Sequence, residues 1–185
     1  MLTFENYLTD IPFLIAGIPL TIGISIGAFI CGVIISLPMA VIRILKTPFI
    51  NQIILGWIEF FRTTPPLVHI VWIYYVFPVA FDLRFSALTV VILALSANTS
   101  AQMAEIFRAG IQSIPRGQTE AGTVLGLNYV QRLFYIILPQ AVRLIMAPSA
   151  NTLVSLLKDS SLAAIILSLI HISEHTRRTP ISYAV

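Results

Sequence analysis

The stretch EAGTVLGLNYVQRLFYIILP, residues 120–139, decides how the rest of this chain is organised. It begins with small and polar residues from Glu120 to Gly126 and becomes apolar towards Pro139. It separates two long apolar runs, residues 86–111 and 130–157, so it ends one membrane helix and begins the next. An interfacial helix with a solvated Glu120 is one interpretation, and a helix that docks on another molecule is the alternative.

The composition favours lipid as the solvent of this chain. Of its 185 residues, 57% are hydrophobic and 10% are charged, and the mean hydropathy is +0.92. A soluble domain carries about 25% charged residues. We therefore expect an all-α, multi-pass helical membrane protein.

Several functions are excluded by the residues present. The net charge of +3 comes from scattered single cations rather than a basic stripe, so no nucleic-acid partner is expected. One cysteine, Cys31, cannot form an internal disulfide, and three histidines lack metal-ligand spacing, so no metal site is predicted. The chain has no G-x-x-x-x-G-K-[ST] phosphate loop and no catalytic motif, so we do not expect an enzyme.

Apolar runs predict the membrane helices. Each run is long enough for the ~20 residues that cross a ~30 Å hydrocarbon core. The four predicted spans are Ile11–Ile42, Gln52–Val79, Ser86–Ile111 and Val130–Leu157. Residues 162–172 are also apolar, but they are too short for a fifth span.

Turn and capping residues predict where the helices end. Gly126 is placed to stop the helix of the opening stretch, and Asn128 with Gln131 is typical of the N-cap of the next one. Pro139 and Pro148 predict bends in the fourth span. Within the second span, two consecutive prolines at 65 and 66 disfavour regular helix just before them.

The basic residues predict the orientation. The N-terminal tail has no Lys or Arg, and the turn after the second span, residues 81–84, has Arg84 alone. The connections after the first and third spans are richer in them: Arg43, Lys46, Arg62, Arg108, Arg116 and Arg132. By the positive-inside tendency the N-terminus lies outside and residues 116–139 lie in the cytoplasm.

Polar residues inside the predicted spans are the candidates for function. Asn98, Gln102 and Glu105 are spaced i, i+4, i+7, and Asn151, Ser155 and Asp159 repeat every four residues, so each set shares one helical face. A carboxylate in a membrane helix costs several kcal/mol unless it meets a partner or water. Glu59 and Arg62, three residues apart, are expected to pair.

The opening stretch resembles the cytoplasmic signature of permease subunits of bacterial ABC importers, E-A-A-x3-G-x9-I-x-L-P. The matching residues are Glu120, Ala121, Gly126, Ile136, Leu138 and Pro139. Gly122 stands where the signature has alanine.

Three further motifs resemble the permeases for polar and basic amino acids. They are EFFRTTP at 59–65, AEIFRAGIQSIP at 104–115 and SLLKDSSL at 155–162. Thr63 replaces the usual glycine, and His69 stands where glutamine is common. The resemblance implies a permease domain over residues 11–166 with a coupling segment at 116–139.

The resemblance also implies a fifth membrane helix after the Lys158–Asp159 loop, and residues 167–185 do not match it. We expect this stretch to be an atypical tail, either a truncation or foreign sequence. The chain therefore shows four of the five helices of the family.

The resemblance implies what the opening stretch binds. Glu120, Ala121, Gly122 and Gly126 would form the coupling helix that docks on an ATPase subunit. Gly122 and Gly126 would leave one face of the helix open to an approaching surface. The carboxylate of Glu120, in the first turn, would interact favourably with the positive N-terminal end of the helix dipole. Val124 and Leu125 would add apolar contact.

The same resemblance implies the transport path and the partners. An amino acid needs an acceptor for its ammonium group and donors for its carboxylate, and the candidates are Asn98, Gln102, Glu105, Ser155, Asp159 and His69. The alternative is that they only join neighbouring helices, for ~0.6 kcal/mol each. The implied partners are two ATPase subunits that hold ATP and Mg, an identical or paralogous second permease subunit and an extracytoplasmic binding protein. No cofactor is expected in this chain.

Two other functions remain open. One is a secondary transporter driven by an ion gradient, with Glu105 carrying the proton. The other is a non-transporting helical scaffold in the membrane. The expected location is the bacterial inner membrane in each case, and the acidic path residues only weakly favour a cationic substrate.

Overall fold

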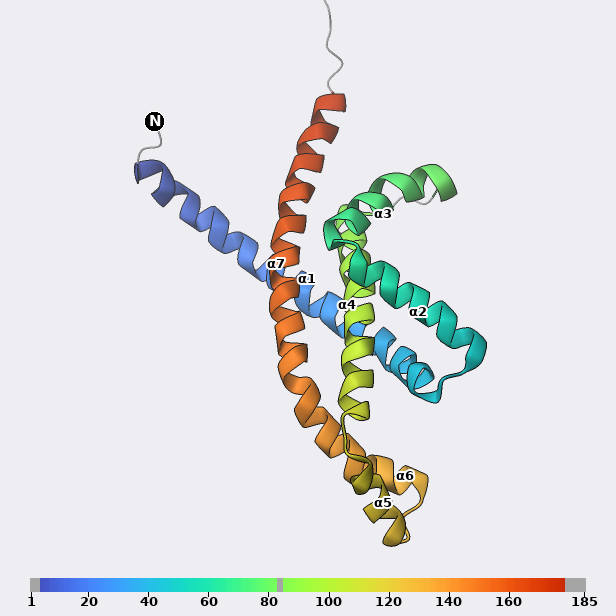
Figure 1. The fold of residues 1–185 in the computed structure, drawn as a ribbon. Coiled ribbons are helices and arrows are strands. Elements are labelled where there is room, and N and C mark those ends of the chain that lie inside the picture. The colour runs from blue at the N-terminus through green and yellow to red at the C-terminus, as the bar shows by residue number, and fades with distance from the viewer. Residues whose placement is uncertain (1–3, 83–84, 179–185) are drawn as a thin grey trace, which may run out of the picture.

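The computed structural model describes the backbone of residues 4–82 and 85–178, and the side chains of residues 15, 17–82 and 85–161. Every regular element in this part of the chain is helical, which confirms the all-α prediction (Figure 1). The α-helices are α1 (Phe4–Leu45), α2 (Pro48–Thr63), α3 (Pro66–Phe81), α4 (Ala87–Gln112), α5 (Arg116–Val124), α6 (Tyr129–Arg132) and α7 (Leu138–Arg178). A π-helical turn, η1 (Leu133–Ile137), joins α6 to α7.

Within the described part of the chain, three continuous helical segments are long and apolar enough to cross a membrane: Gly17–Leu45, Ala87–Gln112 and Tyr129–Ser161. The second predicted span is not one continuous helix, because α2 and α3 meet at a bend of 105°. The bend lies at Pro65 and Pro66, which have no N–H for the α-helical ladder. The pair α2–α3 is apolar enough to cross a membrane only if both helices count together, and its sharp bend is typical of a broken span or a re-entrant loop. Leu83 and Arg84, predicted to lie in the turn that follows it, are outside the described residues.

Helix α4 is the centre of the molecule, because it packs against α1, α2, α3 and α7. Two buried apolar clusters lie along it. The first is formed by Ile24, Ala28, Ile70, Val90, Val91, Ala94, Leu95 and Leu156. The second, nearer the α4 C-terminus, is formed by Met39, Ile54, Ile58, Phe61, Ala101 and Ala104.

Two glycines allow helices to approach α4 closely. A Cβ at Gly32 of α1 would lie 2.7 Å from Cβ of Thr99, and a Cβ at Gly110 would overlap Ile145 of α7. By contrast, a Cβ at Gly23 or Gly27 would meet no atom within 4 Å. Among these glycines of the long helices, those at the α1–α4 and α4–α7 contacts have no room for a side chain.

Helix α7 continues well beyond the fourth predicted span. It includes residues 162–172, which were expected to be a separate short segment, and ends at Arg178. Near its middle, the hydroxyls of Ser25 and Ser160 are 2.7 Å apart and completely buried, so they join α1 to α7. The side chains beyond residue 161 are not described.

Candidate functional site

Helix α5 begins at the first residue of the predicted coupling segment, 116–139, and Glu120 lies later in the helix than expected. Helix α5 starts at Arg116, directly after Pro115 at its N-cap, so Glu120 lies in the second turn. The prediction that Glu120 interacts with the helix terminus from the first turn is therefore wrong. Proline presets the backbone for the start of a helix, so Pro115 places the first turn of α5 at Arg116.

The end of α5 agrees with the sequence prediction. Gly126 adopts φ +74°, a left-handed conformation that costs glycine little. The N–H of Gly126 donates to Thr123 O and that of Leu127 to Gly122 O, both at 3.0 Å. Asn128 and Gln131 then form the predicted capping box, with two hydrogen bonds of 2.9 Å.

A π turn carries the chain from α6 into α7. Pro139 has no N–H, so the carbonyl of Tyr135 has no α-helical donor at that position. The N–H of Leu138 instead donates to Leu133 O, five residues back. The helix therefore runs through Pro139 with a local change of pitch (Figure 1).

Gly122 faces its own chain. It is the buried residue of α5, and a Cβ there would lie 2.8 Å from Cδ1 of Ile136 and 2.9 Å from Cγ of Arg132. The surface that approaches Gly122 is thus the α6–η1 segment. Arg132 also donates a short hydrogen bond to Thr123, and Gln140 Nε2 donates to Gln118 Oε1 at 3.3 Å.

The opposite face of α5 is open. We call Glu120, Ala121, Val124 and Leu125 the coupling surface. These residues are spaced i, i+1, i+4 and i+5, so they share one side of the helix. All four are exposed, Val124 to 88% and Leu125 to 76%. Two bare aliphatic side chains beside a carboxylate form a surface suited to protein contact.

Asn98 holds the break between α2 and α3. Its Nδ2 donates to the backbone oxygen of Phe61 at 2.5 Å. In a regular helix that oxygen would accept from residue 65, but Pro65 has no N–H. Gln102 Nε2 donates to Asn98 Oδ1 at 2.6 Å and fixes the amide in this orientation.

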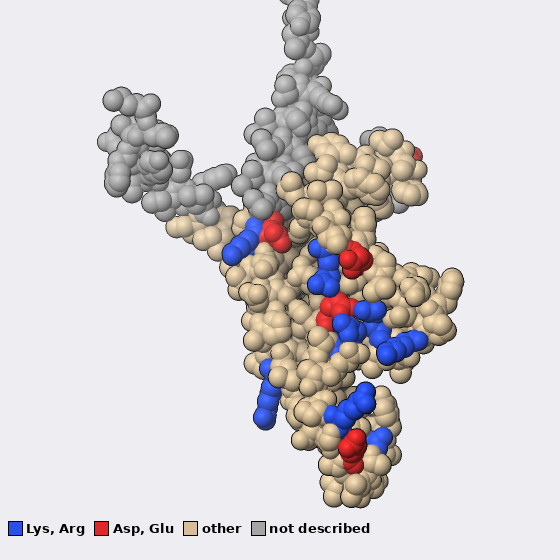
Figure 2. Space-filling model, in the orientation of Figure 1, with Lys and Arg blue, Asp and Glu red and all other residues tan. Residues whose placement is uncertain are grey.

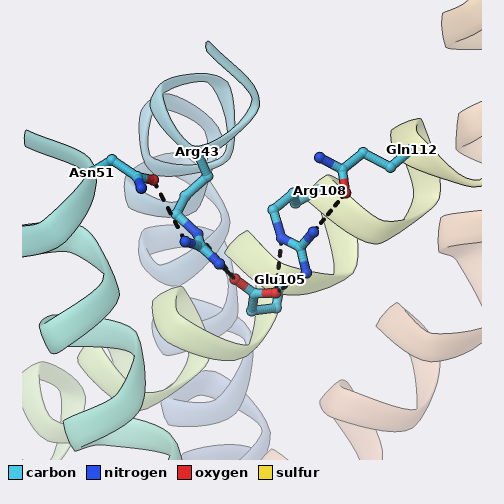
Figure 3. Close-up of polar contacts among 5 residues, drawn as sticks. All are labelled: Arg43, Asn51, Glu105, Arg108 and Gln112. Atoms are coloured by element: carbon cyan, nitrogen blue, oxygen red, sulfur yellow. Dashed lines mark hydrogen bonds and ion pairs between the residues drawn. The ribbon is translucent and has the colours of Figure 1, made fainter. Parts of the chain in front are cut away.

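Glu105 lies between two arginines (Figure 3). Oε1 accepts from Arg43 Nε at 3.2 Å and Nη2 at 2.8 Å, and Oε2 accepts from Arg108 Nε at 2.9 Å and Nη2 at 2.6 Å. Asn51 and Gln112 accept further hydrogen bonds from the outer guanidinium nitrogens of Arg43 and Arg108. We call these five residues the Glu105 network. It ties the ends of α1, α2 and α4 together and engages both oxygens of the carboxylate.

His69 lies among aromatic rings at the start of α3. It is 4% exposed, and its ring centroid is 4.5 Å from that of Phe61 and 5.3 Å from that of Phe60. Neither ring nitrogen has a hydrogen-bond partner in the described part of the chain. With Ser96 it contributes to the lining of a mainly apolar cavity of about 560 Å³.

The polar row of α7 (Asn151, Ser155 and Asp159) does not contact the polar row of α4 through any hydrogen bond or ion pair of the described side chains. Asn151 and Ser155 are exposed on α7, and Asp159 is half-buried. Between the described side chains, no hydrogen bond or ion pair links this row to Asn98, Gln102 or Glu105. The role of these residues in a transport path stays a prediction.

Two residues were missed or misjudged from the sequence. Arg43 is 62 positions from Glu105, so no local spacing could reveal their ion pair. Arg62 was expected to pair with Glu59, and that is wrong: the ion pairs among the described side chains are those of Glu105. Arg62 instead contributes to a cavity of about 610 Å³ with Gln102, Glu105 and Arg108.

Comparisons with known proteins assign the family. The family of binding-protein-dependent transport system inner membrane components matches residues 32–176. The chain is 40% identical over 156 residues to the L-cystine transport system permease protein TcyB of Bacillus subtilis, covering 84% of this chain and 66% of that protein. It is 36% identical over 157 residues to the glutamine transport system permease protein GlnP of Escherichia coli, covering 84% and 72%.

Solved structures agree with these relatives. A crystal structure of an amino acid ABC transporter with histidines superposes with a TM-score of 0.83 and 29% identity, covering 98% of this chain and 86% of that one. The MetNI methionine ABC transporter, at a TM-score of 0.70 and 20% identity, shares the fold and covers 85% of this chain and 76% of its own. The resemblance drawn from the motifs is confirmed. The chain therefore belongs to the family of binding-protein-dependent transport system inner membrane components, and its relatives there are amino-acid ABC transporter permeases.

Proposed function

We propose that this chain is the permease subunit of an ABC importer that carries a polar or charged amino acid across the bacterial inner membrane. ATP hydrolysis in two partner ATPase subunits, which hold ATP and Mg, drives the transport. The observation that carries the proposal is the coupling surface on α5. The named substrates of its relatives, L-cystine and glutamine, and arginine for the similar permease protein ArgU of Corynebacterium glutamicum, favour an amino acid.

The contacts behind α5 explain how a force on it reaches the membrane. Its inner face packs through Gly122 against Arg132 and Ile136, and two side-chain hydrogen bonds add to this contact. The segment α6–η1 continues without a loop into α7. Displacement of α5 by a partner therefore moves α7, whose polar row is exposed.

The orientation follows from the charges. Figure 2 shows the Lys and Arg side chains of this face mainly from its middle to its lower end, where α5 and α6 lie. In the proposed complex this end lies in the cytoplasm, with the N-terminus and the docking site of a binding protein on the outside. A second permease subunit, identical or paralogous, covers the polar row of α7, and the amino acid passes between the two subunits.

Charge reversal on the coupling surface tests the proposal. We expect Glu120→Arg to abolish ATP-dependent amino-acid uptake while the permease remains in the membrane, because the new cation faces the ATPase groove. The measurement is uptake of labelled amino acid into vesicles, with membrane content followed by immunoblot. If uptake survives, the coupling assignment is wrong.

A matched pair of cysteines tests the contact itself. Val124 on α5 and Val79 near the end of α3 are each 88% exposed, and the helices α5 and α3 lie far apart (Figure 1). In a Cys31→Ser background, which removes an exposed thiol, Val124→Cys should crosslink to the ATPase subunit and Val79→Cys should not. Equal crosslinking at both positions would contradict the proposal.

A further inference from the structure

Arg62, near the bend between α2 and α3, is a cation without a hydrogen-bond or ion-pair partner among the described residues. It is exposed, it lies one residue before the end of α2, and it has no hydrogen bond or ion pair with any described residue. An ionisable side chain in an apolar helix pair such as α2–α3 needs a partner or water. What Arg62 binds is therefore a functional question.

The cavity that Arg62 lines carries an excess of positive charge. Its lining residues are Arg62, Gln102, Glu105, Ile106, Arg108 and Ala109, around a volume of about 610 Å³. The lining thus has two guanidinium groups and one carboxylate. Both oxygens of that carboxylate already accept from Arg43 and Arg108, so Glu105 is not free to neutralise Arg62.

The polar groups of the cavity fit the two ends of an amino acid. A guanidinium presents a planar fork of donors that matches a carboxylate in a bidentate arrangement. Gln102 gives its Nε2 to Asn98, and its Oε1 has no hydrogen-bond partner among the described residues. That oxygen is available to accept from an ammonium group. The hollow is open on one side, and its volume leaves room for a small molecule.

We propose that Arg62 binds the α-carboxylate of the transported amino acid in this cavity, with Gln102 accepting from its ammonium group. The inference rests on the proposed function and adds a substrate contact to it. It reverses the weak expectation that acidic groups select the substrate, because Glu105 is held by arginines and the open charge is positive. The same anion chemistry is present in a phospholipid headgroup, so the test must separate the two sources.

The experiment compares two ligands that differ in one group. The permease–ATPase complex is placed in nanodiscs of neutral lipid without binding protein. The probe is a polar or charged amino acid that the wild-type complex imports, such as L-glutamine, L-arginine or L-cystine, together with the analogue whose α-carboxylate is a carboxamide. We expect the wild-type complex to bind the carboxylate form roughly 10- to 100-fold more tightly, as for a hydrogen-bonded charge pair.

Substitutions then test whether Arg62 causes the preference for the carboxylate form. Arg62→Gln should bring the ratio of the two affinities to about one, and Arg62→Lys should keep part of the preference because the charge remains. The matched control is Arg143→Gln, an exposed arginine of α7 that does not line the cavity and should keep the full preference. If Arg62 only supported the structure, Arg62→Gln would lower the affinity for both ligands by the same factor, and that result would overturn the proposal.

Two further outcomes also overturn it. One is a wild-type complex that shows no preference for the carboxylate form. The other is an Arg62→Gln variant that keeps the preference and loses only its affinity for phosphatidylglycerol, measured by native mass spectrometry, which would assign the anion to a lipid. Uptake of the polar and charged amino acids by the wild-type complex is measured in parallel: if it imports none of them, the proposed function fails and the inference with it.

Discussion

Helices α4 and α7 carry the same kind of polar row but differ in what surrounds it. In the most apolar stretch of Ala87–Gln112, 61% of the residues are buried within the chain, against 6% for Tyr129–Ser161. On α4, Asn98 and Glu105 have hydrogen-bond partners on other helices. On α7, Asn151 and Ser155 are exposed.

This difference separates internal support from outward contact. The polar row of α4 stabilises contacts within the chain. Asn98 donates to the carbonyl at the break between α2 and α3, and the Glu105 network joins α1, α2 and α4. The row of α7 is directed to something outside the chain, since exposed amide and hydroxyl groups are costly against lipid. In the proposed complex that surface is the second permease subunit or the water-filled path between the two.

The largest expected effect is at the carboxylates. Glu105→Gln should lower the free energy of unfolding of the purified permease by about 3 kcal/mol, because it leaves Arg43 and Arg108 as uncompensated charges. Asp159→Asn, the matched change on α7, removes no ion pair of the described chain and should cost less than about 1 kcal/mol. Unfolding in detergent followed by intrinsic fluorescence measures both. Equal losses would mean that the two rows do not differ as described.

A smaller effect is expected at the matched asparagines. Asn98→Leu leaves the carbonyl of Phe61 without a donor and should cost about 2 kcal/mol. Asn151→Leu, at an exposed position, should change the stability of the chain by less than about 0.5 kcal/mol and yet reduce uptake. The same unfolding assay and vesicle uptake test the pair. Unchanged uptake with Asn151→Leu would remove α7 from the transport path.

Local chemistry made part of this structure predictable. The stop at Gly126 and the capping box of Asn128 depend on residues within a few positions, and both were correct. The spans followed from the length of the apolar runs. Glu120 was expected in the first turn, but α5 starts four residues earlier at Arg116, because the proline at position 115 favours a helix start there.

The rest depends on contacts that sequence spacing does not carry. Arg43 is 62 positions from Glu105 in the sequence and donates hydrogen bonds to it. Arg108 donates to the other oxygen of the same carboxylate, so the three residues form one network. The two prolines at 65 and 66 did predict an interrupted helix, but no local spacing identified Asn98 as the donor to the carbonyl of Phe61. The spacing of Glu59 and Arg62 predicted a pair that does not form, because helical proximity allows an ion pair without requiring one.

ATP-driven uptake by the reconstituted complex tests the central claim most directly. The permease, the ATPase subunits and the binding protein are placed in proteoliposomes without any ion gradient, and entry of labelled amino acid is measured. We predict uptake with ATP and none with a non-hydrolysable analogue, because the chain itself has no phosphate loop and depends on its coupling surface. Uptake that needs a proton gradient and proceeds without ATP would contradict the account and assign transport to an ion-driven mechanism.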